Sequence, residues 1–456
     1  MPCAVYSPAM DTGKDQDQGC RDQGMGRPAS GLAALPALAP VRQIRRPLTV
    51  SEYYHAAIGR HPQSHVSSHD VVIFLEGTLG TAGVDQGCWQ VALDAVAEVN
   101  PGARLRLVGR RQRASWCSDG LPPQLRLIED CSWSGDSSDG LAALLGERLD
   151  LEQGRVAEVI VTRSPQTPEQ TQVPEQAPTV RVIFRASHAA MDGMGTLHLM
   201  QEVFRALRGE PLLGSNATFT DTDLMRHGPA RTVLMDRQAR FMSLMGAPQG
   251  DERGGLWQRL RVAGPQPNLL PRLAGALADY GRQHGTGAGL VRIGIPGNLR
   301  RHVPELLTTM NFAGMTYVDV ACHEDAGIAA IKERLNLLRE GNAEMNYRRR
   351  FELIRYLPFA WVDRLISVNE TNYRTPNLHE SAILTVLGSF KKALFSGGGF
   401  AAERMCCVPQ LENVFVAVSG LQGHFDITVG MPRVLASGGR MAQLCAFLQQ
   451  ALESRD

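Results

Sequence analysis

Short β-rich apolar runs alternate with segments of helical period in both halves of the chain, and this alternation limits the possible folds strongly. Residues 70–77 form an apolar run that ends at Gly77, which is typical of a buried strand. In residues 84–100 apolar side chains recur at nearly helical spacing until Pro101 and Gly102 end the pattern. The same alternation returns from Leu269 onward. We therefore expect an α/β (α+β) fold in which helices cover mixed sheets.

The same patterns locate the other elements. Strands are expected at residues 104–108, 124–128, 156–163, 179–186, 290–296, 314–321, 414–419 and 424–429. Helices are expected near residues 47–52 and at 141–149, 196–207, 269–284, 326–339 and 440–452. The last of these is amphipathic, with one apolar face formed by Met441, Leu444, Cys445, Leu448 and Leu452.

With 456 residues, the chain is too long for one core of ordinary size, so we expect two lobes. Residues 1–46 are rich in Gly, Asp, Gln, Ala and Pro and predict a flexible N-terminal arm. Residues 47–215 would form the N-terminal lobe and residues 216–456 the C-terminal lobe. The polar stretch 164–178 reads as a solvated loop between two paired strands, with a domain boundary as the weaker alternative.

Composition narrows the class of protein. The chain is 43% hydrophobic and 20% charged, and its 47 basic and 46 acidic residues leave a net charge of +1, which gives no electrostatic reason to expect nucleic acid as a partner. No run is apolar and long enough to predict a membrane span or a secretion signal. The nine cysteines lack paired spacing, as expected for free thiols in a reducing compartment. We expect a cytoplasmic protein, most simply a monomer.

One motif has a definite chemical logic. The expected strand 179–186 runs directly into His188, and Asp192 and Gly193 follow four and five residues later. An imidazole of near-neutral pKa can take a proton from an attacking amine or alcohol if it is held rigidly. Asp192 would fix the turn that presents His188, and Gly193 and Gly195 would let the backbone bend. The simpler alternative is a buried histidine at the end of a strand, followed by an ordinary Asp-Gly turn.

The segment 187–193 resembles the HxxxDG motif of the chloramphenicol acetyltransferase superfamily, which includes the condensation domains of nonribosomal peptide synthetases. Ser187 stands where the condensation-domain form, HHxxxDG, has its first histidine. Residues 71–77, 100–107, 293–300 and 310–314 are similar to other segments of that superfamily and occur in the same order. The resemblance extends from about residue 47 to residue 452.

This resemblance implies a free-standing acyltransferase (EC 2.3.1-like) with two chloramphenicol-acetyltransferase-like lobes arranged as a V and an active site at their seam. His188 would be the general base. The donor would be a thioester on coenzyme A or on a phosphopantetheinyl carrier protein, and the acceptor a small amine or alcohol, in natural-product biosynthesis. No metal and no permanently bound cofactor would be needed. The alternative is a non-catalytic scaffold or docking module that binds a carrier protein.

The resemblance also implies a structural partner for Asp192. In the superfamily an arginine of an "LR" strand lies against the motif aspartate, and alignment through Asn100 and Pro101 puts Arg104 at that position. Arg106 would point to the same face of a strand and is the alternative partner. Either guanidinium could hold both carboxylate oxygens and so fix the turn.

Where many relatives have Ser-Asn-x-Gly, this chain has Thr385 to Gly388, and the DFGWG motif of plant acyltransferases is absent. The Thr385 hydroxyl could stabilise an oxyanion, although a packed strand threonine is the simpler interpretation. Three weaker patterns could indicate other kinds of site. They are the histidines at positions 61, 65 and 69, the cysteines at 406 and 407, and the glycine-rich stretch 396–400.

The histidine spacing suits a metal site on a helix, but Pro62 and the following serines favour a turn. A cysteine nucleophile paired with His188 is conceivable, yet nothing in the sequence marks either thiol as activated. The stretch 396–400 lacks a phosphate-binding pattern and predicts a flexible loop. Arg348, Arg349 and Arg350 are either a solvated helix face or a contact for a phosphate of the donor.

Overall fold

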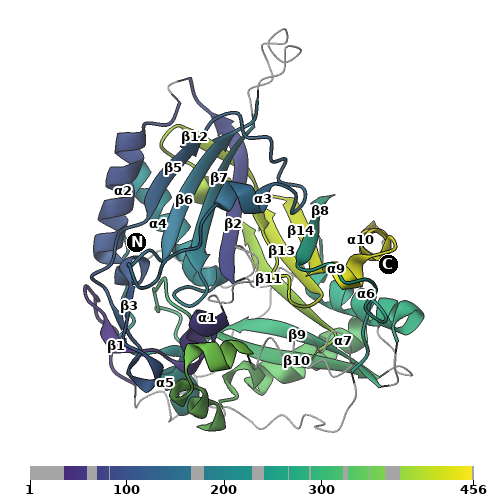
Figure 1. Cartoon of the computed structure of the whole chain (residues 1–456). Coiled ribbons are helices and arrows are strands. Elements are labelled where there is room, and N and C mark those ends of the chain that lie inside the picture. The colour runs from purple at the N-terminus through teal and green to yellow at the C-terminus, as the bar shows by residue number, and fades with distance from the viewer. Residues whose placement is uncertain are drawn as a thin grey trace, which may run out of the picture.

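The computed structural model describes residues 35–58, 69–81, 83–165, 179–228, 241–264, 266–286, 289–321, 327–347, 349–364 and 380–453 (Figure 1). Two large sheets form the centres of two lobes, and helices cover them on their outer faces. The expected α/β fold with two lobes is confirmed. No described helix has both the length and the apolar character that a membrane crossing requires.

The N-terminal lobe is built on a five-stranded sheet in the order β12-β2-β7-β6-β5. Its strands are β12 (Phe400–Cys407), β2 (Asp70–Leu79), β7 (Val180–Ser187), β6 (Ala157–Arg163) and β5 (Gln124–Ile128). Helices α2 (Gln86–Val99) and α4 (Gly193–Leu207) pack together on one face, and α3 (Leu141–Leu145) lies near the other. The expected pairing of the strands around 156–163 and 179–186 is confirmed, because β6 and β7 are antiparallel with Ala157 opposite Ala186.

The C-terminal lobe is built on a six-stranded sheet in the order β10-β9-β11-β13-β14-β8. Its strands are β10 (Ala313–Ala321), β9 (Leu290–Asn298), β11 (Ala382–Phe390), β13 (Phe415–Leu421), β14 (His424–Pro432) and β8 (Gly255–Ala263). Helices α6 (Leu269–His284), α7 (Ile328–Glu340) and α10 (Arg440–Glu453) pack around it, with the short α9 (Arg433–Ala436) beside α10. The five residues expected on the apolar face of the last helix are all buried, as predicted.

A third, small sheet of order β1-β4-β3 lies beside the N-terminal lobe. It contains β1 (Arg45–Pro47), β4 (Ser115–Cys117) and β3 (Arg106–Val108), and the chain continues from β1 into α1 (Val50–Ile58). The prediction of a strand at 104–108 was therefore only partly correct. Its second part is β3, but residues 101–104 form a 3₁₀ turn, η2 (Pro101–Arg104). Pro101 fits the first position of such a turn and cannot donate to a strand ladder.

Of the expected flexible arm, residues 1–46, the structure describes only residues 35–46, because residues 1–34 lie outside the described part. Residues 35–46 are not a free arm. The amide of Val41 donates to Ser215 O at 2.8 Å, that of Ile44 donates to Ser118 Oγ at 2.8 Å, and Leu35 and Leu38 pack against a small apolar cluster. A few leucines and backbone hydrogen bonds are enough to hold an extended segment of this composition against the lobe.

Strand β12 joins the two lobes. It belongs to the C-terminal half of the sequence, yet it pairs with β2 of the N-terminal lobe, with Met405 opposite Leu75. The glycine-rich stretch that precedes it is a packed turn rather than the expected flexible loop. Gly397 and Phe400 exchange backbone hydrogen bonds, and the indole of Trp89 donates to Gly398 O at 3.3 Å. Gly397, Gly398 and Gly399 all have positive φ, which explains why glycines fill this turn.

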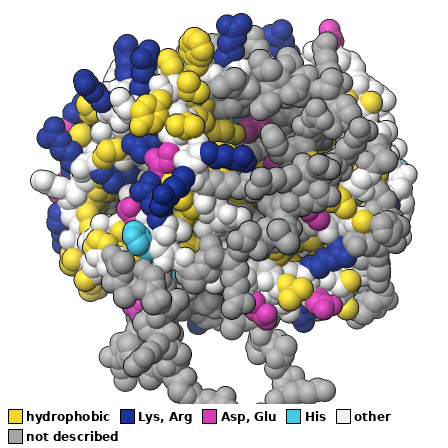
Figure 2. Space-filling view, turned by 90° about the horizontal axis from the view of Figure 1, so that it is seen from below, with side chains coloured by type: hydrophobic (Ala, Val, Ile, Leu, Met, Phe, Trp, Pro, Cys, Tyr) yellow, Lys and Arg dark blue, Asp and Glu magenta, His cyan; other side chains and the backbone are white. Residues whose placement is uncertain are grey.

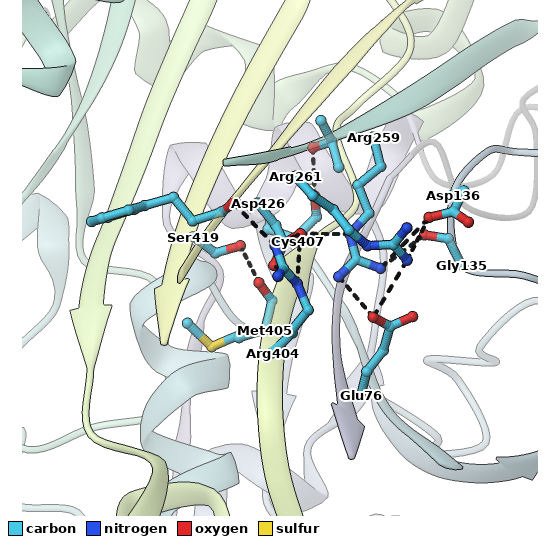
Figure 3. Close-up of polar contacts among 12 residues, drawn as sticks. Glu76, Gly135, Asp136, Arg259, Arg261, Arg404, Met405, Cys407, Ser419 and Asp426 are labelled. Carbon is cyan, nitrogen blue, oxygen red and sulfur yellow. Dashed lines mark hydrogen bonds and ion pairs between the residues drawn. The ribbon is translucent and has the colours of Figure 1, made fainter. Parts of the chain in front are cut away.

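A buried network of charges also connects the lobes (Figure 3). Arg259 on β8 binds Asp426 on β14 at 2.7 Å and reaches Glu76 on β2 at 2.9 Å. Glu76 also accepts from Arg181 on β7 at 3.1 Å, and Arg404 on β12 donates to Asp426 at 3.0 Å. Burial alone would raise the pKa of Glu76, but the arginines around it outweigh burial and lower that pKa. The network therefore fixes β2 of one sheet against β8 and β14 of the other.

Candidate active site

The site begins at the end of the central strand β7. Every residue of β7 is buried, and the strand ends at Ser187, where the backbone amide of His188 still donates to His69 O at 3.1 Å. The chain then turns, because the amides of Ala190 and Met191 donate to Ser187 O at 2.9 and 3.0 Å. The Ser187 hydroxyl accepts from the amide of Ala189 at 3.3 Å. The turn that presents His188 is thus closed by Ser187.

Asp192 caps the helix that follows. It is the N-cap residue of α4, and its Oδ1 accepts from the amide of Gly195 at 2.6 Å. Its carboxylate also accepts two hydrogen bonds from Arg300, at 3.0 and 3.1 Å, and one from the amide of Phe312 at 2.6 Å. The side chain of Asp192 is 5% exposed. Arg300 and Phe312 come from the C-terminal half, so Asp192 connects the motif to the second lobe.

The prediction that Arg104 or Arg106 would pair with Asp192 was wrong. Arg104 ends the 3₁₀ turn η2, and its guanidinium donates to the carbonyls of Ala97 at 3.1 Å and of Ser118. Arg106 pairs with Asp119 at 2.6 Å. A residue in a 3₁₀ turn does not follow the two-residue alternation of a strand, so the alignment placed Arg104 on the wrong face. The partner is Arg300, in the 3₁₀ turn η4 (Leu299–His302) after β9.

Asn311 is a second residue that the sequence analysis did not assign to the site. Its amide group donates to the carbonyls of His188 at 2.8 Å and Ala189 at 3.2 Å, and the side chain is buried. It holds the motif turn from the side of the C-terminal lobe. Both Arg300 and Asn311 lie in segments that resemble the superfamily. The sequence showed that these two segments are similar to the superfamily, but it could not show that they contact the turn of His188 from the other lobe.

The glycines of the motif allow this close approach. A Cβ atom on Gly195 would collide with the carbonyl oxygen of Thr309, and one on Gly193 would come within 3.0 Å of Leu387 on β11. The start of α4 therefore packs directly against residues 308–311 and β11. The expectation that Gly193 and Gly195 serve bending of the chain needs refinement, because here they serve the contact between the lobes.

Three imidazoles gather at this point. The ring of His55, on α1, lies parallel to that of His188, with centroids 3.9 Å apart and planes 5° apart. His69 immediately precedes β2, the strand that pairs with β7, and its Nδ1 is 2.8 Å from Oε1 of Glu412. The described residues include no cluster of His, Cys, Asp or Glu with the geometry of a metal site. Of the histidines considered for such a site, His61 and His65 lie outside the described residues.

Burial lowers the pKa of His188 and outweighs the opposing effects of its own backbone carbonyl and the Asp192 charge. The His69 charge lowers this pKa further, while the Asn311 side chain raises it. Burial thus favours the neutral imidazole, which is the form that can accept a proton.

The structure gives less support to the other candidate site residues. Cys406 and Cys407 are buried on β12, and burial raises the pKa of Cys407 to about 12 and that of Cys406 well above its usual range. Neither thiol is in the thiolate form that a nucleophile requires. Thr385 is half-buried on β11, opposite Ala417 of β13 and two residues before Leu387. Arg349 and Arg350 are exposed on η6 (Arg349–Tyr356), and Arg348 lies outside the described residues.

The comparisons with known proteins come from structure alone. No protein-family profile matches this sequence, and no curated protein is similar enough in sequence to count as a relative. The condensation domain of the Monacolin K polyketide synthase MokA superposes with a TM-score of 0.61 at 13% identity, covering 90% of this chain and 96% of that one. The chain has the fold of a condensation domain.

Two further solved structures support this assignment. A variant starter condensation domain of the rhizomide synthetase RzmA, in complex with C8-CoA and Leu-SNAC, matches with a TM-score of 0.59 and 13% identity, over 90% of this chain and 94% of that one. The first condensation domain of the CDA synthetase matches with a TM-score of 0.59 and 15% identity, over 90% of this chain and 96% of that one. The resemblance that the HxxxDG motif indicated is confirmed at the level of the fold.

Proposed function

We propose that this condensation-fold chain is an acyltransferase in which His188 acts as the general base. The observation that carries the proposal is the arrangement of the motif. His188 stands at the end of β7, where burial lowers its pKa, and both lobes hold its turn through Asp192, Arg300 and Asn311. Such rigid placement of an imidazole is what proton transfer in a transition state requires.

The proposed reaction is a single transfer. His188 takes a proton from the amine or hydroxyl of the acceptor as its nitrogen or oxygen attacks the thioester carbonyl carbon. A new C–N or C–O bond forms, the C–S bond breaks, and the leaving sulfur takes the proton from the His188 imidazolium. The products are an amide or ester and a free thiol. Asp192 takes no proton in this scheme, because its carboxylate is fully engaged as a helix cap and an ion-pair partner.

The donor in this proposal is a thioester on coenzyme A or on a phosphopantetheinyl carrier protein, and the acceptor a small amine or alcohol. The solved RzmA domain is in complex with C8-CoA, which is an acyl thioester, and with Leu-SNAC. This complex supports the choice of donor class. We place the reaction in natural-product biosynthesis, in the cytoplasm. Thr385 remains a candidate donor to the oxyanion, since its strand contacts the start of α4 through Leu387.

Release of thiol tests the proposal. The purified chain is incubated with acyl-CoA thioesters of graded length and a mixture of amines and alcohols, and free thiol and acylated acceptor are measured by mass spectrometry. Thiol release that requires both the protein and an acceptor supports the acyltransferase. Binding of the thioesters without release, across the panel and with carrier-bound donors, would instead favour a scaffold or docking module.

A further inference from the structure

A histidine that takes a proton at one ring nitrogen is usually oriented by a hydrogen bond at the other. In His188 the atom Nδ1 is buried and has no hydrogen bond of good geometry among the described residues, although its own backbone carbonyl and the Asn311 side chain are near enough to raise the pKa of the ring. The Asn311 amide nitrogen donates to the backbone carbonyl of His188 at 2.8 Å. These neighbours lie at the edge of the ring, and a contact with its face would fix the imidazole plane.

The His55 ring supplies a flat support. At 3.9 Å and 5° it is stacked on the His188 ring more closely than any other described aromatic pair. A stacked ring at van der Waals distance blocks rotation of His188 out of its plane, because any tilt would drive one ring edge into the other. Nδ1 of His55 likewise has no hydrogen-bond partner among the described residues, so contact with His188 is the main interaction of this ring that the structure shows.

The helix that carries His55 is firmly held. Two residues earlier, Tyr53 is completely buried and stacks on Phe359 with centroids 4.5 Å apart, and its hydroxyl donates to Leu357 O at 2.5 Å. One residue before that, Glu52 accepts two hydrogen bonds from Arg46, at 2.7 and 2.8 Å. The His55 ring, which supports His188, is thus carried by a firmly anchored helix.

The charges around the pair keep the support neutral. Burial, followed by the charges of His188 and His69, lowers the pKa of His55 well below its usual range. The ionisable groups that face the pair are His69 with its partner Glu412, next to β2, and Asp192 with its partner Arg300, at the start of α4. A neutral His55 does not repel the proton that His188 gains during the reaction.

We propose that His55 is a positioning residue for His188: its ring fixes the plane of the base by stacking. This inference rests on the proposed function. It requires a flat ring at position 55 and does not require a titratable nitrogen there.

Two substitutions separate these requirements. His55→Ala removes the ring and should lower kcat by about a hundredfold, the size of effect that misplacing a catalytic group can have, while KM changes little. His55→Phe restores a flat ring without nitrogen atoms and should recover most of kcat, with the acid limb of the pH profile unchanged. His284→Ala is the matched control, because the His284 ring also packs against another ring, that of Tyr280 with centroids 4.5 Å and planes 38° apart, but on the outer helix α6. It should leave kcat unchanged.

Thermal unfolding and NMR complete the test. Unfolding curves of the His55 variants show whether lost activity is simply lost fold, and ¹³C relaxation of the His188 ring reports its mobility without any turnover. Increased ring mobility in His55→Ala, but not in His55→Phe, is the expected result. A wild-type kcat and a rigid His188 in His55→Ala would overturn the inference and leave the acyltransferase proposal standing. If His55→Phe is as inactive as His55→Ala, the nitrogen is needed and the stacking role is wrong. If the wild type releases no thiol, the proposed function fails and the NMR comparison alone decides the role of His55.

Discussion

Some residues of the site could be predicted from the sequence and others could not. The position of His188 at the end of a buried strand followed from the pattern of residues 179–193, because strand and helix periods are local properties. The partner of Asp192 did not follow, because it comes from a residue 108 positions away, Arg300. His55 and Glu412 gave no sequence signal at all, since only the folded chain brings α1 and the segment before β13 to the same place.

At this scale the first prediction concerns the corrected ion pair. Arg300→Ala leaves the buried carboxylate of Asp192 without its bidentate partner and should lower the free energy of unfolding by about 3–5 kcal/mol, with a loss of activity. In a double-mutant cycle with Asp192→Ala, the double variant should be less damaged than the sum of the singles. Arg106→Ala, which breaks the more exposed pair with Asp119, is the control and should change the free energy of unfolding far less than Arg300→Ala. Additive effects of Arg300→Ala and Asp192→Ala in urea unfolding would contradict the pairing.

A second residue-scale prediction follows from Asp221 at the start of α5 (Asp221–His227). Burial, and then the charge of Glu52, raise the pKa of Asp221 to about 7, although the Arg46 charge opposes this. The folded state therefore keeps a proton that the unfolded chain releases near pH 4. Stability should fall as the pH rises from about 4 to about 7 on account of this group.

The change Asp221→Asn removes the titration. Its free energy of unfolding should depend less on pH across this range than that of the wild type and should exceed it above pH 7. Urea unfolding at pH 5 and pH 8 checks this, with the exposed Asp119→Asn as a control for general charge effects. Equal pH dependence of Asp221→Asn and wild type would show that Asp221 is charged in the folded state.

Among the elements, those with clear periodicity were predicted closely, including α6 at residues 269–284, β5 at 124–128 and the C-terminal helix. The strands β8, β11 and β12 were not predicted. In β8 the buried side includes Arg259, so the usual alternation of apolar and polar residues is broken. Such a strand can be recognised only when the acidic partners on other strands are known.

The prediction at this scale concerns the connection between β6 and β7. Of the loop expected at residues 164–178, residues 166–178 lie outside the described part of the chain. Arg163 lies opposite Val180, and the amide of Ser164 donates to Thr179 O at 3.1 Å, so the two strands are still side by side at both ends of the segment 165–178. A two- to five-residue turn can join antiparallel strands at this separation. Replacing residues 165–178 by Gly-Asn-Gly should therefore leave the melting temperature and thiol release nearly unchanged. Aggregated protein after this change would mean that the segment packs into the fold.

At the scale of the whole molecule, the two lobes are joined by β12, by apolar contacts and by the charge network of Figure 3. The ring of Trp133, in the N-terminal lobe, lies 6.4 Å from that of Trp257 on β8. On the described part of the face shown in Figure 2, Lys and Arg side chains are interspersed with acidic and hydrophobic ones. The division of the chain at residues 215 and 216 stays a prediction, and the return of β12 to the first lobe makes any such division incomplete.

The network leads to a prediction about the union of the lobes. Arg259→Ala leaves Glu76 and Asp426 buried without their shared partner and should reduce the free energy of unfolding by about 3–5 kcal/mol. Arg261→Ala, two residues along the same strand, breaks a half-exposed pair with Asp136 and a longer contact of 3.7 Å with Glu76, and should cost clearly less than Arg259→Ala. If both variants unfold at the same urea concentration, the network does not stabilise the contact between the lobes.

In the proposed reaction His188 accepts the proton of the acceptor while the two lobes hold its turn. The most direct measurement is the single-turnover rate of thiol release by wild type and His188→Ala with the best acyl-CoA and amine pair, together with thermal unfolding of both proteins. We predict a loss of about a hundredfold to ten-thousandfold in rate with an unchanged melting temperature. A folded His188→Ala variant that releases thiol at a rate close to that of the wild type would contradict the account.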